Sequence, residues 1–408
     1  MKRAIARFLG LLLIIHLFPN IGYADQNQDN SNELVITQES ASSIYEITYM
    51  DMHPELNFTV QRVDDCSPGW VARQIESRDT TSDLYVIRTG MTGYTDLMQK
   101  GFCADLNDLE SLFPRLLSMT PAILDAISYQ KHLYAVPEMV ILQSHSCLLC
   151  DPTHPLWSRY HLEDHHSVSD ILDMMQDLEE KDELDEWWFW NDHADAGHLY
   201  NLCVVGSASY METEESEISL EKDEYRELFS RFDQIRQRLL NRIDPPSTKD
   251  PLFYAVSYVD ESLLSNENLT PVLITPLSGQ REILQLGLQV LVMNPYAPHR
   301  EEAIQYLNDL LDAYSPLQSL YLYPENAEPM KDPYAELTGR PWILSPGLIS
   351  WYQKSSEQIQ VPLKGLMSLF WDNQGLEMEK RYLDGNITID QYISYLDGKL
   401  TMLKMETE

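Results

Sequence analysis

The chain has 408 residues, a mass of 47.3 kDa and a formal net charge of -35 at pH 7. Single hydrophobic cores usually stop growing at about 250 to 300 residues, so this length predicts two cores and two lobes. A surface this acidic repels phosphate groups, which argues against nucleic acids and anionic membrane surfaces as partners.

The first 24 residues have the pattern of a secretory signal. Lys2, Arg3 and Arg7 precede an apolar run over 8–18, and the small residues Gly22 and Ala24 offer a cleavage site. The run is too short to span a bilayer as a helix, although an uncleaved signal would leave the protein anchored. No cysteine lies at the end of the run, so no lipid-attachment site is evident. We expect a protein that is secreted or held in the periplasm or at the cell surface, with a disordered leader over 25–33.

Five cysteines follow, and an odd count leaves at least one thiol unpaired. They are Cys66, Cys103, Cys147, Cys150 and Cys203. Cys147 and Cys150 have the spacing of a redox or metal motif, but no second such pair accompanies them. Buried thiols or a local disulfide are the favoured interpretation, and redox or metal use is the alternative.

The first part of the chain alternates between strands and helices. Strands are predicted at 34–37, around 58–60 and at 83–87, and the intervening and following helices at 42–52, 70–77 and 94–100. This alternation over short connections indicates a parallel, doubly wound sheet. Ligands of such sheets lie beyond the carboxyl ends of the strands, here the loops at 39–40 and 89–93.

The middle of the chain is predicted to be mostly helical from residue 120 to residue 191, most clearly over 170–184. The acidic stretch over 212–224 is predicted to be an exposed loop that enters a helix over 225–242. Prolines 245 and 246 end that helix.

The last third begins with two predicted strands, at 272–274 and 288–292. The tail is predicted to end in an amphipathic helix. Gly385 stops one helix, and Thr388 with Gln391 forms a capping box for the next. The apolar face of this last helix consists of Ile393, Leu396, Leu400 and Leu403.

Five landmarks occur in an order that resembles one large family. They are Pro54–Val60, Asp83–Ile87, Leu133–Pro137, Glu302–Leu307 and the tail Tyr382–Glu408. The arrangement is similar to the bacterial extracellular solute-binding proteins of family 1, which feed ABC importers. Two motifs of that family differ: His166–Asp170 replaces its usual helix start, and its second-lobe glycine signature is not recognisable.

The resemblance implies an α/β protein with a two-lobed periplasmic-binding-protein-like fold of type II. Each lobe would be a doubly wound sheet, and solute would be held between the lobes by hinge closure. Lobe 1 would comprise 34–138 with 291–325, and lobe 2 would comprise 139–290 with 326–408. The chain would cross between lobes at Val136–Met139, near Leu291–Asn294 and after Tyr321. The resemblance implies a monomer without a cofactor.

Sugar sites combine aromatic platforms with side chains that accept hydrogen bonds from hydroxyl groups. Candidate ligand contacts therefore lie at the predicted strand ends of lobe 1 and in aromatic stretches of lobe 2. They are Glu39, Ser40, Thr89, Met91 and Tyr94 from the first lobe, and Trp190, Asn191, Asp192, Tyr254 and Tyr258 from the second.

Enzyme interpretations have weaker support in the sequence. Five histidines and nearby carboxylates could bind zinc, but no HExxH motif accompanies them. They are His161, His165, His166, His193 and His198. The nucleophile elbow of α/β-hydrolases is also missing.

We therefore expect a non-catalytic protein that delivers a small polar solute, a sugar or oligosaccharide, to the membrane subunits of an ABC importer. The alternative is a ligand-binding sensor or orphan binding protein that signals to a membrane receptor, and an extracellular hydrolase is third.

Overall fold

The computed structural model describes residues 33–39, 46, 49, 53–54, 57–164, 166–190, 194–215, 218–241, 250–255, 268–326, 346–366, 368–371 and 373–407. The predicted signal and all of the predicted leader except Glu33 lie outside these residues. Within them, no helix is both long and apolar enough to cross a membrane.

The first sheet contains the strands predicted near the N-terminus. Its hydrogen-bonded order is β2-β1-β3-β10-β11, and β6 also pairs with β10. Strands β1 and β3 are parallel, with Thr37 opposite Tyr85, whereas β10 runs antiparallel to β3 and to β6. The strands are β1 (Glu33–Gln38), β2 (Asn57–Arg62), β3 (Leu84–Arg88), β6 (Ala135–Leu142), β10 (Leu284–Met293) and β11 (Ile359–Gln360).

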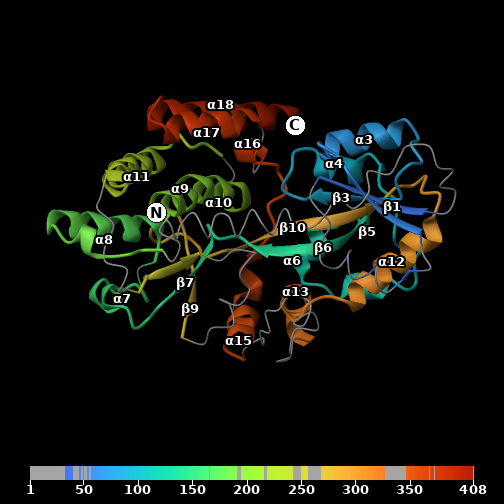
Figure 1. Cartoon of the computed structure of the whole chain (residues 1–408), viewed down its shortest axis with the longest axis horizontal. Helices are drawn as coiled ribbons and strands as arrows, with labels where there is room; N and C mark the ends of the chain where they lie inside the picture. The colour runs from blue at the N-terminus through green and yellow to red at the C-terminus, as the bar shows by residue number, and fades with distance from the viewer. Residues whose placement is uncertain are drawn as a thin grey trace. The chain divides into compact units, whose positions relative to one another are not determined.

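Helices cover both faces of this sheet. In Figure 1, α3 (Pro68–Glu76) and α4 (Tyr94–Gln99) lie above the strands, and α12 (Arg300–Asp312) lies below them. Ser67 caps α3 by accepting a hydrogen bond from the backbone N–H of Trp70, as N-cap serines do. Four further helices contribute to the same core: α5 (Phe113–Leu117), α6 (Pro121–Ala126), α13 (Pro316–Leu322) and α15 (Pro346–Ser355).

A second, smaller sheet has the order β8-β7-β9, and both pairings are antiparallel. Its strands are β7 (Cys147–Cys150), β8 (Phe253–Ala255) and β9 (Thr270–Leu273). A parallel bridge between Trp190 and Phe253 adds to it. Around it lie α7 (Pro155–Arg159), α8 (Val168–Glu180), α9 (Asp195–Tyr200), η2 (Asn201–Val205), α10 (Gly206–Glu214), α11 (Asp223–Asn241) and α16 (Ser368–Trp371).

The predicted helix end, turn and last helix at the C-terminus are confirmed. Gly385 has a φ of +73° and follows α17 (Asn373–Leu383), and α18 (Ile389–Thr407) follows it. The backbone N–H of Thr388 donates to Gln391 Oε1 over 3.0 Å, and that of Gln391 donates to Thr388 Oγ1 over 3.3 Å. This is the capping box, and α17 and α18 pack side by side (Figure 1).

Buried apolar side chains form two clusters. The first surrounds the first sheet and includes one face of β7, and the second includes the other face of β7 and the helices around it. The chain passes between the clusters three times, from β6 to β7 through 143–146, from β9 to β10 through 274–283, and from β11 to α16 through 361–366. We call these segments the first, second and third crossings.

The clusters differ from the expected lobe boundaries. Besides residues of β7 and β9, three segments that were assigned to lobe 2 supply side chains to the first cluster: Val140–Leu142, Leu284–Val290 and Leu348–Val361. The third crossing therefore begins at residue 361 instead of directly after Tyr321. The reason is that β10 and β11 pair with each other beside β6, which keeps both in the first sheet.

Two predictions in the middle of the chain are wrong. Residues 120–191 contain β6, β7 and a hairpin of β4 (Ser128–Tyr129) and β5 (His132–Leu133), besides short helices. Short apolar runs of this kind do not distinguish a strand from a buried helix. The acidic stretch over 212–224 is not wholly an exposed loop, because Glu212 lies on α10 with only 2% of its surface exposed.

All five cysteines are free and buried. Successive residues of a strand face opposite sides, so Cys147 joins the first cluster and Cys150 the second. Burial raises the pKa of the Cys147 thiol to about 12 and that of Cys150 well above its ordinary value. This arrangement favours the buried-thiol interpretation of the pair.

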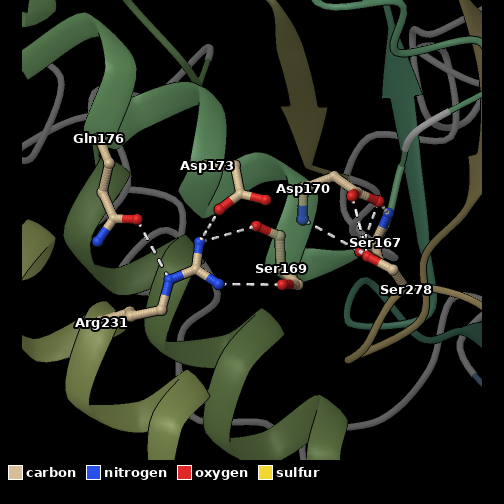
Figure 2. Close-up of polar contacts among 7 residues, drawn as sticks. All are labelled: Ser167, Ser169, Asp170, Asp173, Gln176, Arg231 and Ser278. Atoms are coloured by element: carbon tan, nitrogen blue, oxygen red, sulfur yellow. Dashed lines mark hydrogen bonds and ion pairs between the residues drawn. The ribbon is translucent and has the colours of Figure 1, made fainter.

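Figure 2 shows a polar cluster that fixes α8. Ser167 and Asp170 form a capping box at its N-terminus, and Ser278 donates to Asp170 Oδ1 over 2.9 Å. Arg231 of α11 bonds to Ser169 Oγ over 3.1 Å, to the Ser169 carbonyl over 3.2 Å and to Asp173. The guanidinium therefore joins α11 to the first turns of α8.

We expect Ser167→Ala to lower the free energy of unfolding by about 1 to 2 kcal/mol, because it removes the N-cap hydroxyl and its bond to Ser278. Urea-induced unfolding measures this difference. Ser77→Ala, at an exposed position after α3, is the control and should change stability by less than about 0.5 kcal/mol. Equal effects of the two changes would contradict the role of Ser167 as the N-cap of α8.

Candidate ligand-binding site

Buried polar side chains occur at the ends of β1 and β3. Gln38, the last residue of β1, donates from Nε2 to Glu46 Oε2 over 3.1 Å, and both side chains are buried. Thr89 follows β3 and is fully buried, and its backbone N–H donates to the Leu288 carbonyl over 3.0 Å. Thr89 Oγ1 has no hydrogen-bond partner among the described residues. A buried hydroxyl without a partner costs folding energy, so it marks a place where a ligand could bind.

A second polar pair lies on the neighbouring strands. The register of β10 against β6 shifts between Gln289 and Val290, which face Met139 and Pro137 and leave Glu138 as the extra residue of a bulge. Gln289 Nε2 donates to Glu138 Oε2 over 2.9 Å, and both residues are buried. Bulges redirect side chains, and this one accompanies a carboxylate in an otherwise apolar strand.

We name five buried polar residues the strand-end cluster, because they lie on or directly after neighbouring strands of the first sheet or bond to such a residue: Gln38, Glu46, Thr89, Glu138 and Gln289. It provides carboxylates, amides and one hydroxyl. Carboxylates accept hydrogen bonds, whereas amides and hydroxyls both donate and accept. This set suits a ligand with many hydroxyl groups. Among the described residues no three His, Cys, Asp or Glu side chains are grouped as metal ligands.

The predicted first-lobe contacts have different environments. Glu39 is exposed, and its Oε1 accepts a hydrogen bond from the backbone N–H of Cys66 over 3.0 Å. Thr89 belongs to the strand-end cluster, and the partly buried Met91 lies in the same loop. Tyr94 is a fully buried residue of the first core, where its hydroxyl donates to the Ala126 carbonyl over 2.9 Å. Tyr94 therefore stabilises the first core, and its contact with solute stays a prediction.

The predicted second-lobe contacts are less grouped. Trp190 is fully buried in the second core and stacks on His198 with 5.5 Å between ring centroids. Tyr254 lies on β8 and packs against the first cluster, and burial raises its pKa. Their role in solute binding stays a prediction. The remaining candidates lie outside the described residues: Ser40, Asn191, Asp192 and Tyr258.

The histidines weighed as zinc ligands also have separate surroundings. His166 Nε2 lies 2.8 Å from Glu282 Oε1, and His161 Nδ1 lies 3.7 Å from Glu163. The imidazole ring of His198 stacks on the ring of Trp190. His165 and His193 lie outside the described residues.

The comparisons with known proteins give a structural match without a sequence match. No protein-family model matches the sequence, and neither does any curated protein. Among solved structures, the maltose-bound MalE3 of T. maritima matches with a TM-score of 0.55, covering 91% of this chain and 99% of that one. The chain has a two-lobed periplasmic-binding-protein-like fold.

The sequence identity in this match is 13%, so the match shows the fold alone. Altogether 581 chains of solved structures match. A fold shared so widely does not by itself assign a ligand. Membership of family 1 therefore stays a prediction, and any ligand has to be inferred from the side chains of this chain.

Four of the five residues of the strand-end cluster were not among the ligand contacts predicted from the sequence. Glu138 interrupts the apolar run Ala135–Leu142, and Gln289 interrupts Leu284–Met293. A single polar residue inside an apolar strand was the available signal. Gln38 and Glu46 lie next to a predicted strand end but carried no motif.

A tight contact joins the Thr89–Gly93 loop to the third crossing. Thr92 Oγ1 lies 2.7 Å from Ser368 Oγ, and Gly365 has a φ of +84°. A Cβ atom added to Gly365 would lie 2.7 Å from Thr92 Cα. The loop that carries two of the candidate contacts is therefore held against residues 365–368.

A buried polar network links the first crossing to the start of β10, directly after the second crossing. His145 belongs to the first crossing, and Gln285 lies at the start of β10. The distance between His145 Nε2 and Gln285 Oε1 is 2.8 Å. Ser209 of α10 donates to the same oxygen over 2.7 Å. Burial lowers the pKa of His145 to about 4, and its bond to Gln285 opposes this shift. His145 is therefore neutral at pH 7.

We expect Gly365→Ala to destabilise the protein more than Gly279→Ala does. Both glycines have positive φ, which costs about 1 to 2 kcal/mol for alanine. Only Gly365 also meets backbone atoms, which adds about 1 to 3 kcal/mol, whereas a Cβ at Gly279 meets nothing within 4 Å. Urea-induced unfolding measures both changes. Similar losses would show that the Thr92 contact is looser than described.

His145 predicts a loss of stability in acid. Its pKa in the folded protein lies below its ordinary value of about 6.5, so its contribution is complete above pH 6.5 and is lost as the pH falls towards 4. Over this range the wild type should lose roughly 3 kcal/mol more than His145→Gln. Urea-induced unfolding at several pH values measures the difference. His161→Gln, at an exposed position, is the control and should follow the wild type.

Proposed function

We propose that the protein is an exported, non-catalytic solute-binding protein that captures a sugar or oligosaccharide for an ABC importer. It would act as a monomer and deliver its solute to the importer's membrane subunits. The fold supports this proposal, since MalE3 binds maltose on a similar scaffold. The observation that carries it is the strand-end cluster.

The cluster matches a hydroxyl-rich solute in three ways. Thr89 Oγ1 and Gln38 Oε1 have no hydrogen-bond partner among the described residues, so a ligand hydroxyl would satisfy groups that are otherwise unpaired. The carboxylate of Glu138 can accept hydrogen bonds from such hydroxyls. The cluster also lies at the carboxyl ends of β1 and β3, where ligands of open α/β sheets bind.

Thermal unfolding with a panel of solutes tests the proposed function. Maltose, maltotriose, glucose, single amino acids and dipeptides form the panel. A solute that binds only the folded state stabilises it by about 2.7 kcal/mol at 100 times its dissociation constant. We expect at least one sugar to raise the melting temperature. Stabilisation by peptides alone, or by no member of the panel, would refute the sugar assignment.

Glu138→Gln tests the position of the site. Removal of the charge weakens hydrogen bonds from sugar hydroxyls, so we expect roughly tenfold weaker binding of the stabilising sugar, as measured by calorimetry. Glu325→Gln, at an exposed position, is the matched control and should leave the affinity unchanged. Unchanged affinity in Glu138→Gln would place the sugar elsewhere.

A further inference from the structure

Helix α10 is unusual because it is polar in sequence yet buried on every side. Residues 206–212 are all buried, and Ser207, Ser209 and Glu212 each expose 2% of their surface or less. Buried polar groups are normally retained only where hydrogen bonds satisfy them. The partners of α10 therefore indicate what this helix does.

Those partners come from the first and third crossings and from the start of β10, directly after the second crossing. At the first, the Cα position of Gly206 is so close to His145 that an added Cβ would lie 3.2 Å from its carbonyl oxygen. After the second, Gln285 accepts from Ser209 and donates to Thr213 Oγ1 over 3.3 Å. At the third, Lys364 donates its backbone N–H to Glu212 Oε1.

Glu212 is the charged member of this set. Lys364 Nζ also donates to the Glu212 carbonyl over 2.8 Å, so the third crossing is attached to α10 by two bonds from one residue. The backbone N–H groups of Gly365 and Leu366 also favour the ionised carboxylate. Glu212 Oε2 has no hydrogen-bond partner among the described residues. The carboxylate is therefore buried against a short run of backbone donors and is only half satisfied.

Few other charges surround this carboxylate. Burial raises the pKa of Glu212 to about 7, and the Lys364 ammonium of the third crossing opposes that shift. On the same helix, Glu214 is paired with Arg281 at 3.2 Å, and Glu215 is paired with Lys222. His145 of the first crossing is neutral in this pH range, as its lowered pKa shows.

The third crossing carries the effect of Glu212 to the candidate site. Gly365 packs on Thr92, and Ser368 shares a hydrogen bond with it. Thr92 belongs to the same loop as Thr89 and Met91. A change in how firmly α10 holds residues 364–366 therefore reaches the loop where solute is proposed to bind.

We propose that Glu212 is a positioning residue that fastens the third crossing to α10 when its carboxylate is ionised and loosens it when the carboxylate is protonated. The solute-binding loop then responds to pH. The proton is exchanged with solvent, and hydrogen bonds to an ionised acceptor are about twice as strong as those to a neutral one. The consequence for solute binding rests on the proposed function, but the fastening itself does not.

Hydrogen exchange of the backbone amides of Lys364, Gly365 and Leu366 tests the fastening without any solute. Exchange is measured at about pH 6 and about pH 8 and corrected for the intrinsic chemical rate at each pH. In the wild type we expect protection to rise roughly fivefold at the higher pH, because ionised acceptors hold N–H groups more strongly. In Glu212→Gln the corrected protection should not depend on pH.

Two further variants complete the design. Glu214→Gln, on the same helix, is the matched control and should behave as the wild type. Lys364→Met removes the ammonium that favours the ionised carboxylate, so the rise in protection should move to higher pH. It tests the proposal even if Glu212→Gln fails to fold.

The proposal is overturned if the wild type shows no rise, if Glu212→Gln keeps the rise, or if Lys364→Met leaves its midpoint unchanged. Because no solute is present, these outcomes are independent of the sugar panel. A protein that binds sugar without pH-dependent protection would refute the fastening alone. A pH-dependent protein that binds no sugar would refute only the proposed function.

Discussion

The pairing of β10 with three other strands is the interaction on which the rest of the structure depends. Its residues bond to β3 on one side, to β6 along most of its length and to β11 at its beginning. It therefore joins early and late segments of the chain into one sheet. It also carries Gln285 into the network with His145 and Gln289 into the strand-end cluster, so both sets of residues depend on one strand.

The parts that could be predicted from sequence are those with local signals. The strands at β1 and β3 are apolar runs bounded by turns, and the last helix has a complete capping box at Thr388 and Gln391. Strands β6 and β7 had no such signal, since their runs suit a buried helix equally well. Helix α10 was missed because acidic residues usually indicate exposure, and only tertiary contacts reveal the burial of Glu212.

The candidate site could be predicted only in part for a similar reason. Thr89 could be named as a candidate because a parallel sheet presents its ligands at strand ends, which is a rule of topology. Glu138 and Gln289 come together through a bulge between strands that are about 150 residues apart, and no local pattern encodes that register. Tyr94 and Trp190 are packed inside the cores, and solute contact by either residue stays a prediction.

The five buried free cysteines have a practical consequence. Each thiol is enclosed, and burial raises the pKa of Cys66, Cys103 and Cys147 to about 12, so reactive thiolate is scarce at neutral pH. A single cysteine introduced on the surface would therefore react with maleimide probes far faster than the native ones. The wild-type chain thus offers a background on which pairs of fluorophores or spin labels can report the distance between the lobes without removal of its own cysteines.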